Sequence, residues 1–211
     1  MPETKEYTVY KFEELSDRAK ERARDWWRGC ENSDFDTEFM YDDFERVAEI
    51  LGVSFKVRHI PLMNGKTRPE PTIWWSGFSS QGDGACFEGS YAYAKGSQKA
   101  IRDYAPKDER LHRIADDLAA AQRPYFYKLV GTATHSGHYY HSGCMSVEVT
   151  HADDSYRGVE WEGVQQALRD FADWMYRQLE AEYEYRMSDE NVDDAIEANE
   201  YTFDEDGNRE D

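Results

Sequence analysis

The stretch that decides the fold is EGVQQALRDFADWMYRQLEAEYEYRM, residues 162–187. Its apolar side chains recur at the 3.6-residue spacing that places them on one face of a helix. We therefore predict a long amphipathic helix whose apolar face is buried against a second layer of the protein. The predicted buried residues are Val164, Leu168, Phe171, Met175 and Leu179.

Four further segments carry helical patterns. Ser16 and Ser188 are suitable N-cap residues in front of two of them, and Gly52 is a suitable left-handed cap after another. Pro124 follows the fourth and marks where it has ended. The predicted helices cover residues 16–29, 36–51, 107–122 and 188–196.

Short runs rich in aromatic and β-branched residues predict strands between these helices. Pro61–Pro71 holds three of the six prolines together with Asn64-Gly65, which predicts a loop. No linker or internal repeat divides the chain, so we predict a single α+β domain over residues 1–211. Its sheet is expected to be mainly antiparallel, with about five strands covered by helices. The predicted strands are residues 7–12, 53–60, 72–78, 85–93, 125–134 and 145–150.

The chain is strongly acidic, with a formal net charge of −19. Such a charge repels phosphate, so we expect no direct binding of nucleic acid. Residues 180–211 hold fourteen acidic residues and two arginines, a net charge of −12. Two interpretations remain open for this acidic segment: a solvated, solubilising end of the chain, or a surface that imitates nucleic-acid phosphate.

The cysteines and the hydropathy indicate a compartment. Cys30, Cys86 and Cys144 are an odd and sparse set, which favours reduced thiols over a disulfide framework. The N-terminus has no apolar signal-peptide core, and no apolar run approaches the roughly 20 residues that span a bilayer. We therefore expect a cytoplasmic protein that contacts no membrane, and we predict no cofactor.

Two glycine- and aromatic-rich stretches, residues 74–89 and 135–144, are candidates for a contact surface. Their glycines and turn residues predict hairpins, and neither stretch has the pattern of a phosphate-binding loop. The hairpin residues that we predict as possible contacts are Trp75, Phe78, Asp83, His138, Tyr139 and Tyr140.

The second stretch also holds residues of the kind that bind zinc. Side chains at a three-residue interval do not share one face of a strand, whose period is two, so we predict no metal. A metal-binding protein or metal-dependent enzyme stays open as the alternative. Its ligands would be His135, His138, His141 and Cys144.

The motifs IWWSGFSSQGDGACFEGSY (residues 73–91) and HSGHYYHSGC (residues 135–144) resemble a family of uncharacterised proteins of tailed phages and prophages. The resemblance extends to YKFEELSDRAKERARDWWR near the start and to SDENVDDAIEANEYTFDEDG near the end. Some members of that family are labelled as antitoxins. The resemblance implies a small phage accessory protein that acts in the cytoplasm of a host bacterium, and it supplies no catalytic residue.

These observations lead to one hypothesis and two alternatives. The hypothesis is a non-enzymatic phage inhibitor whose acidic surface binds a basic host protein, such as a nuclease, a defence complex or a toxin. The alternatives are the metal protein described above and an antitoxin-like protein that neutralises a toxin. The predicted partner-binding residues are Glu180, Glu182, Tyr183, Glu184, Tyr185, Asp189, Glu190, Asp193, Asp194 and Glu197.

Overall fold

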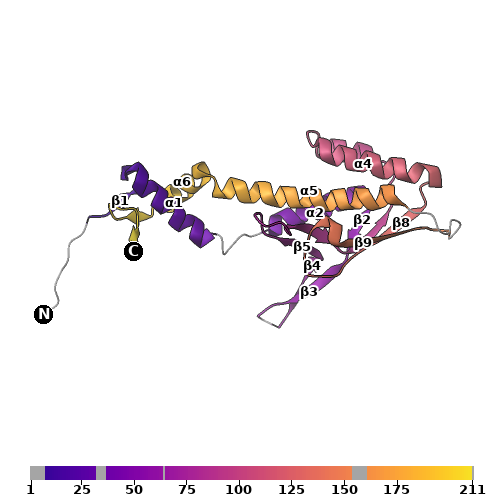
Figure 1. The fold of residues 1–211 in the computed structure, drawn as a ribbon, viewed down its shortest axis with the longest axis horizontal. Coiled ribbons are helices and arrows are strands. Elements are labelled where there is room, and N and C mark those ends of the chain that lie inside the picture. Colours follow the sequence, from indigo (N-terminus) through magenta and orange to yellow (C-terminus); the bar gives the residue numbers. More distant parts are fainter. Residues whose placement is uncertain (1–7, 32–36, 64, 154–160, 211) are drawn as a thin grey trace. The chain divides into compact units, whose positions relative to one another are not determined.

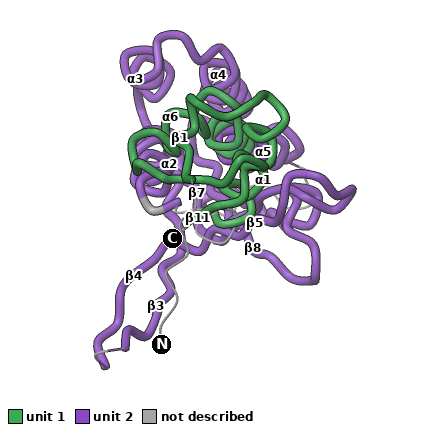
Figure 2. Tube along the Cα trace, turned by 90° about the vertical axis from the view of Figure 1, so that its left-hand side faces the viewer, with its two compact units in different colours: residues 1–36, 180–211 green, residues 37–179 purple. Residues whose placement is uncertain are grey.

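The computed structural model describes residues 8–31, 37–63, 65–153 and 161–210, and its fold is α+β, as predicted (Figure 1). The chain packs as two compact units (Figure 2). Unit 1 comprises residues 1–36 and 180–211, and unit 2 comprises residues 37–179. The single domain over residues 1–211 stays a prediction. No helix within the described ranges is long and apolar enough to cross a membrane.

Unit 2 is built on a four-stranded antiparallel sheet. Its strands alternate between buried and exposed side chains, and the buried set lies on one face, as the period of two requires. The exposed face carries small polar residues such as Ser90 and Thr132. The strand order is β2 (Val53–Phe55), β7 (Gly89–Ala92), β8 (Leu129–His135) and β9 (Met145–His151).

The long helix α5 (Glu162–Met187) supplies most of the apolar layer against this sheet. All five residues of the predicted stripe are buried, with exposed fractions of 1% or less, which confirms the prediction. Phe171 packs against Phe55 of β2 and Phe87 of the neighbouring β6 (Gly84–Phe87), with ring centroids 6.2 and 5.7 Å apart. A Cβ on Gly131 of β8 would lie 3.6 Å from Cδ1 of Leu168, an ordinary van der Waals separation, so the helix packs closely on this strand.

Three further helices complete unit 2: α2 (Glu38–Leu51), α3 (Ser97–Tyr104) and α4 (Glu109–Gln122). Trp174 of α5 joins two of them, since its ring packs against Phe44 of α2 and its Nε1 donates to Asp108, the N-cap of α4. Helix α3 falls within residues 94–106, where the sequence predicted no element. It buries only Ser97 and Ile101, which is too short an apolar pattern to predict a helix.

Three antiparallel strand pairs, two of them hairpins, meet at one triangular junction of backbone hydrogen bonds. Lys56 N donates to Glu88 O, Glu88 N donates to Thr72 O, and Thr72 N donates to Lys56 O, over distances of 2.8, 3.0 and 2.7 Å. The predicted strands 53–60 and 85–93 are interrupted at Lys56 and Glu88, and the predicted strand 72–78 begins at Thr72, because each segment leaves one strand pair there and enters the next. The pairs are β2 with β7, β3 (Val57–Pro61) with β4 (Thr67–Pro71), and β5 (Ile73–Ser76) with β6.

The prediction of a loop over Pro61–Pro71 was wrong. These residues belong to the hairpin of β3 and β4, which we call the arm. Along an antiparallel ladder, pairs with and without backbone hydrogen bonds alternate. Backbone hydrogen bonds join Thr72 to Lys56 and Leu62 to Lys66, so the even-numbered residues of the arm form the hydrogen-bonded pairs. The odd-numbered residues form the pairs without hydrogen bonds. The arm prolines therefore have no ladder bond to lose; they are Pro61, Pro69 and Pro71.

Unit 1 combines α1 (Asp17–Glu31), the C-terminal end of α5, α6 (Asp189–Ala198) and a small sheet. As predicted, Ser16 and Ser188 cap the two short helices, accepting from Ala19 N and Asn191 N respectively. The sheet pairs β1 (Tyr10–Lys11), β10 (Thr202–Phe203) and β11 (Arg209–Glu210). The buried residues of this unit are Phe12, Leu15, Ala19, Ala23, Val192, Ile196 and Phe203.

Candidate functional site

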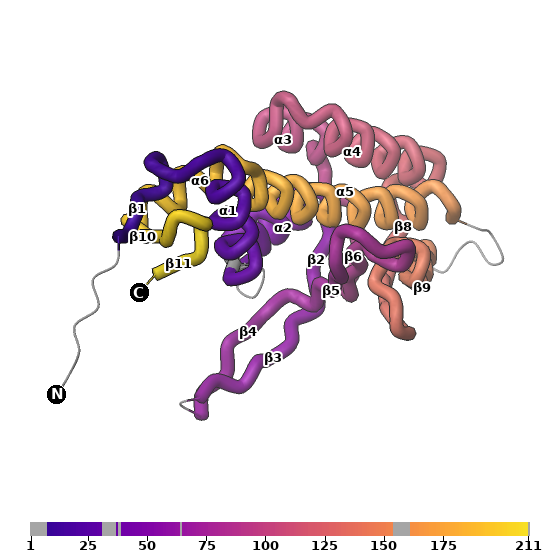
Figure 3. Tube along the Cα trace, turned by 60° about the vertical axis from the view of Figure 1, so that its left-hand side comes forward, coloured from indigo at the N-terminus to yellow at the C-terminus, as the bar shows by residue number. Residues whose placement is uncertain are grey.

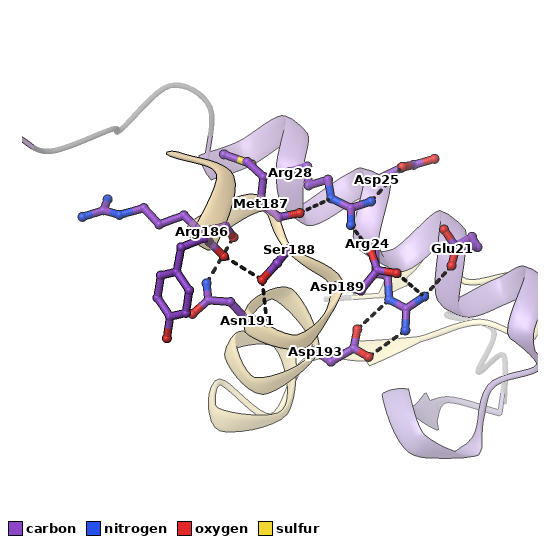
Figure 4. A network of polar contacts seen from close by, with 11 residues as sticks. Glu21, Arg24, Asp25, Arg28, Arg186, Met187, Ser188, Asp189, Asn191 and Asp193 are labelled. Atoms are coloured by element: carbon purple, nitrogen blue, oxygen red, sulfur yellow. Dashed lines mark hydrogen bonds and ion pairs between the residues drawn. The ribbon is translucent and has the colours of Figure 1, made fainter. Parts of the chain in front are cut away.

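Two acidic residues of α6 are paired with two arginines of α1 (Figure 4). Arg24 forms a bidentate contact with Asp193, with both N–O distances at 2.6 Å, and it also contacts Glu21. Arg28 pairs with Asp189 and donates from Nε to the carbonyl oxygen of Met187 at 3.1 Å. The hydrogen bond to Asp193 raises the pKa of Arg24 above its ordinary value, because it stabilises the charged guanidinium.

The spacing on both helices explains why these residues meet. Arg24 and Arg28 are four residues apart, and so are Asp189 and Asp193, so each pair lies on one face of its helix. Glu182 near the end of α5 is likewise paired with Arg186, at 2.8 Å. Three of the predicted partner-binding carboxylates are therefore engaged within unit 1.

A second acidic face of α6 points to solvent. Glu190, Asp194 and Glu197 follow the spacing of one helix face, and all three side chains are exposed. No hydrogen bond or ion pair is described for any of the three, within the part of the chain that the structure describes. We call these three residues the solvent stripe; it is the part of the acidic segment that remains open to a partner.

A cavity of about 180 Å³ lies beside the solvent stripe. Glu197 belongs to both, and Glu13 and Glu200 add two further exposed carboxylates. Its aromatic residues are Phe12 and Tyr201. Carboxylates beside aromatic rings suit the head and the apolar stem of a lysine or arginine side chain, because both rings and carboxylates attract a cation. Lys11 is the basic residue of the lining.

The end of α5 carries the remaining predicted contacts. Glu184 and Tyr185 are exposed, the latter with 64% of its surface accessible, whereas Glu180 and Tyr183 are half-buried. Of the two tyrosines, Tyr185 therefore offers the larger aromatic surface next to the acidic helix. An exposed aromatic residue among carboxylates is the composition that anchors polar interfaces.

The two glycine-rich stretches pack against each other in unit 2. A Cβ on Gly82 would lie 2.7 Å from the ring of Tyr139, and a Cβ on Gly84 would lie 2.6 Å from Cα of His141. Glycine is therefore needed at both positions for the connection between β8 and β9 to approach the hairpin of β5 and β6. The packing indicates a structural role for much of both stretches.

Asp83 holds the turn of the β5–β6 hairpin. Its Oδ2 accepts from the backbone N–H groups of Ser80, at 2.5 Å, and Ser79, at 2.9 Å. These bonds lower the pKa of Asp83 below its ordinary value, because they stabilise the ionised carboxylate. The Asp83 carboxylate therefore stabilises the turn.

The aromatic residues form two stacks. Trp74 stacks on Tyr140 with ring centroids 5.9 Å apart. The guanidinium of Arg58 lies over the Trp74 ring, 4.3 Å from its centroid. Trp75 stacks on Phe78 at 5.4 Å, and Phe78 in turn contacts Tyr176 of α5. Of the predicted hairpin contacts, Tyr139 and His138 are the exposed residues.

The histidines and the cysteine of the second stretch do not converge. His141 Nε2 lies 3.2 Å from Cys144 Sγ, but His135 instead contacts the carbonyl oxygen of Tyr139, and His138 packs on the Tyr139 ring. Within the described residues, no three His, Cys, Asp or Glu side chains are grouped so that they could hold a metal ion. No observed geometry therefore favours the metal-dependent alternative.

A thiol beside an imidazole is the start of a nucleophilic site, but the remaining parts of such a site are not assembled here. Among the described residues, no carboxylate is hydrogen bonded to His141 to orient it. The second thiol, Cys86, is buried, and its burial raises its pKa to about 12. Cys86 is therefore protonated and unreactive at neutral pH.

A family model described as a domain of unknown function (DUF8835) matches residues 37–189 of the chain. The matched range contains the whole of unit 2 and stops at the first residue of α6. No curated protein and no solved structure matches the chain.

Proposed function

Since the chain belongs to the DUF8835 family, a domain of unknown function, we propose its function from the geometry: it is a non-enzymatic binding protein that inhibits a basic host protein. The proposed setting is a phage accessory protein acting in the cytoplasm of a host bacterium. The proposed partner is a nuclease, a defence complex or a toxin with a cationic groove. A toxin as the partner would make the protein an antitoxin.

The observation that carries this proposal is the solvent stripe. Its three carboxylates are held on a helix whose neighbouring acidic face is already anchored to Arg24 and Arg28. A rigid helix presents charges at fixed spacing, which reduces the entropy lost on binding. Charges arranged in this way speed association with a basic surface and make it sensitive to salt.

Charge alone gives modest affinity, because exposed ion pairs contribute about 0–1 kcal/mol each and are screened beyond about 8 Å at physiological salt. The cavity beside the solvent stripe adds a place for contacts that are shielded from water. A lysine or arginine side chain of the partner would place its stem against Phe12 and Tyr201 and its charge among Glu13, Glu197 and Glu200. Desolvated contacts of this kind supply most of the free energy of an interface.

The experiment compares two triple variants with equal changes of charge. One neutralises the stripe, Glu190→Gln, Asp194→Asn and Glu197→Gln; the control neutralises three exposed carboxylates of unit 2, Asp42→Asn, Glu45→Gln and Asp117→Asn. Proteins captured from a bacterial lysate at low salt are identified and purified, and association rates with the wild type and both variants are measured between roughly 50 and 500 mM salt.

We expect the stripe variant to associate at least about tenfold more slowly than the control at low salt, with the difference vanishing at high salt. We also expect the captured protein to lose its own activity when it is saturated with the wild type. Equal association by both variants, or a captured protein that stays fully active in the complex, would refute the proposal.

A further inference from the structure

The arm differs in charge from the rest of the chain. Residues 57–71 contain three basic residues and one acidic residue, so the arm has a net charge of +2 while the remaining residues sum to −21. Figure 3 shows the arm extending away from the other strands of unit 2. A basic element that projects from an acidic protein is suited to reach an acidic surface.

The register of the arm separates its side chains into two faces. Residues directly opposite each other in an antiparallel pair share a face, so Arg58, Ile60 and Leu62 lie on the same face as Lys66, Arg68 and Glu70. All three basic residues are therefore on one face. Arg58 contacts the Trp74 ring and Glu70 at the base of the arm, and Arg68 also contacts Glu70, at 3.4 Å. Lys66 and Arg68 are the more exposed of the three cations and lie toward the tip.

The tip of the arm is apolar and exposed. Met63 is fully accessible, Leu62 is 41% exposed, and Val57 near the base is 49% exposed. The outer edge of β4 lacks backbone N–H groups at Pro69 and Pro71, so that edge is closed to the addition of another strand. A molecule that docked on the outer edge of β4 would therefore contact side chains, and the tip presents apolar residues flanked by two cations.

The chain itself contains a surface of the complementary composition. The solvent stripe of α6 and the cavity beside it combine exposed carboxylates with Phe12 and Tyr201, and this region belongs to the acidic segment of charge −12. The two cations near the tip are opposite in charge to the carboxylates of the solvent stripe. The apolar side chains of Met63 and Leu62 are suited to pack against the aromatic lining of the cavity. Nucleic acid is a poorer match, since a charge of +2 neutralises few phosphates.

We propose that the arm of one molecule docks on the solvent stripe and the adjoining cavity of a second copy of this chain. In a twofold dimer the contact occurs twice, since each copy offers one arm and one stripe. This inference goes beyond the proposed function, because it concerns purified protein alone and holds whether or not a host protein binds the stripe. It also implies that self-association and the host partner compete for one surface.

The test is a charge exchange followed by sedimentation equilibrium at physiological salt. The arm variant carries Lys66→Glu and Arg68→Glu, and the stripe variant carries Glu190→Lys and Glu197→Lys. Each variant alone places like charges at both contacts of a dimer, so we expect its dimer dissociation constant to rise at least about tenfold. In an equimolar mixture both contacts again join opposite charges, so heterodimers should form with a dissociation constant close to that of the wild type.

A second variant, Leu62→Ser with Met63→Ser, tests the apolar tip without altering charge, and it should also weaken the dimer while far-ultraviolet circular dichroism stays unchanged. A wild-type protein that is monomeric at the highest concentration measured would overturn the proposal, as would a mixture that fails to recover the dimer. Unchanged self-association combined with loss of binding to a short DNA duplex in the arm variant would assign the arm to nucleic acid instead.

Discussion

Lys56 Nζ lies 2.8 Å from Oε2 of Glu88, at the junction where the same two residues also share a backbone hydrogen bond. The bond from Lys56 lowers the pKa of the Glu88 carboxyl below its ordinary value. The three strand pairs that meet at this junction are thus joined by a charge pair in addition to the backbone hydrogen bonds.

This pair predicts a dependence of stability on pH. The folded pKa of Glu88 is below the unfolded value, which is about 4.3, so the pair stabilises the fold above that pH and its contribution is lost as pH falls through the folded pKa. Because Lys56 is largely exposed, the variant Lys56→Gln should lose at most about 1 kcal/mol at pH 7. Urea unfolding between pH 3 and 7 should show a shallower acid-induced loss for the variant; parallel curves would contradict this account.

The buried stripe of α5 predicts a large loss on truncation. Phe171 is fully buried and its ring contacts Phe55, Phe87 and Trp174. Replacing it with alanine should lower the free energy of unfolding by about 3–5 kcal/mol. Leu62→Ala in the exposed arm is the control and should change it by less than about 0.5 kcal/mol. An unchanged denaturation midpoint for Phe171→Ala would refute the assignment.

The two acidic faces of α6 predict opposite outcomes for neighbouring substitutions. Asp193→Asn breaks the bidentate contact with Arg24 and should cost on the order of 1–3 kcal/mol. Asp194→Asn removes the same charge from the solvent stripe and should cost less than about 0.5 kcal/mol. Hydrogen exchange of the α6 amides measures the stability of unit 1 directly. Equal protection in the two variants would show that the pairing with α1 contributes nothing.

The close approach at Gly84 predicts a local rearrangement. Gly84→Ala would place a Cβ 2.6 Å from the backbone of His141, so we expect a loss of about 1–3 kcal/mol and displacement of His141 from Cys144. The displacement is measured as a changed rate of Cys144 modification by a thiol reagent. Gly29→Ala is the control, because a Cβ there would meet no described atom within 4 Å apart from its chain neighbours and the backbone of its own helix. A stable variant with an unaltered modification rate would contradict the packing described.

The helices were predictable because their apolar residues follow one period and their caps are local. Val164 to Leu179 and the capping residues Ser16 and Ser188 all lie where the sequence placed them. The strand breaks were not predictable, since Lys56, Thr72 and Glu88 resemble any residue inside a strand. These residues end their strands only because three segments that are distant in sequence meet there.

Two sequence patterns could have pointed to the arm and to the ion pairs between α1 and α6. Pro69 and Pro71 occupy alternate positions, which is compatible with a strand whose outer edge is free, whereas counting prolines favoured a loop. The four-residue spacings of Arg24–Arg28 and Asp189–Asp193 match each other. The pairing of these residues still depends on contact between α1 and α6. Arg24 and Asp193 are 169 residues apart in sequence, and no local pattern specifies that they meet.

Unit 1 also constrains when the protein can become complete during synthesis. Helix α1 is translated before unit 2, yet Val192, Ile196 and Phe203, which pack with its apolar side chains, are translated after unit 2. Its apolar side chains must therefore stay exposed while the intervening residues are made, a period in which a chaperone or a neighbouring nascent chain has access to them. Slow translation should prolong this interval, and unit 1, which carries the proposed binding surface, should form only after unit 2 has been made.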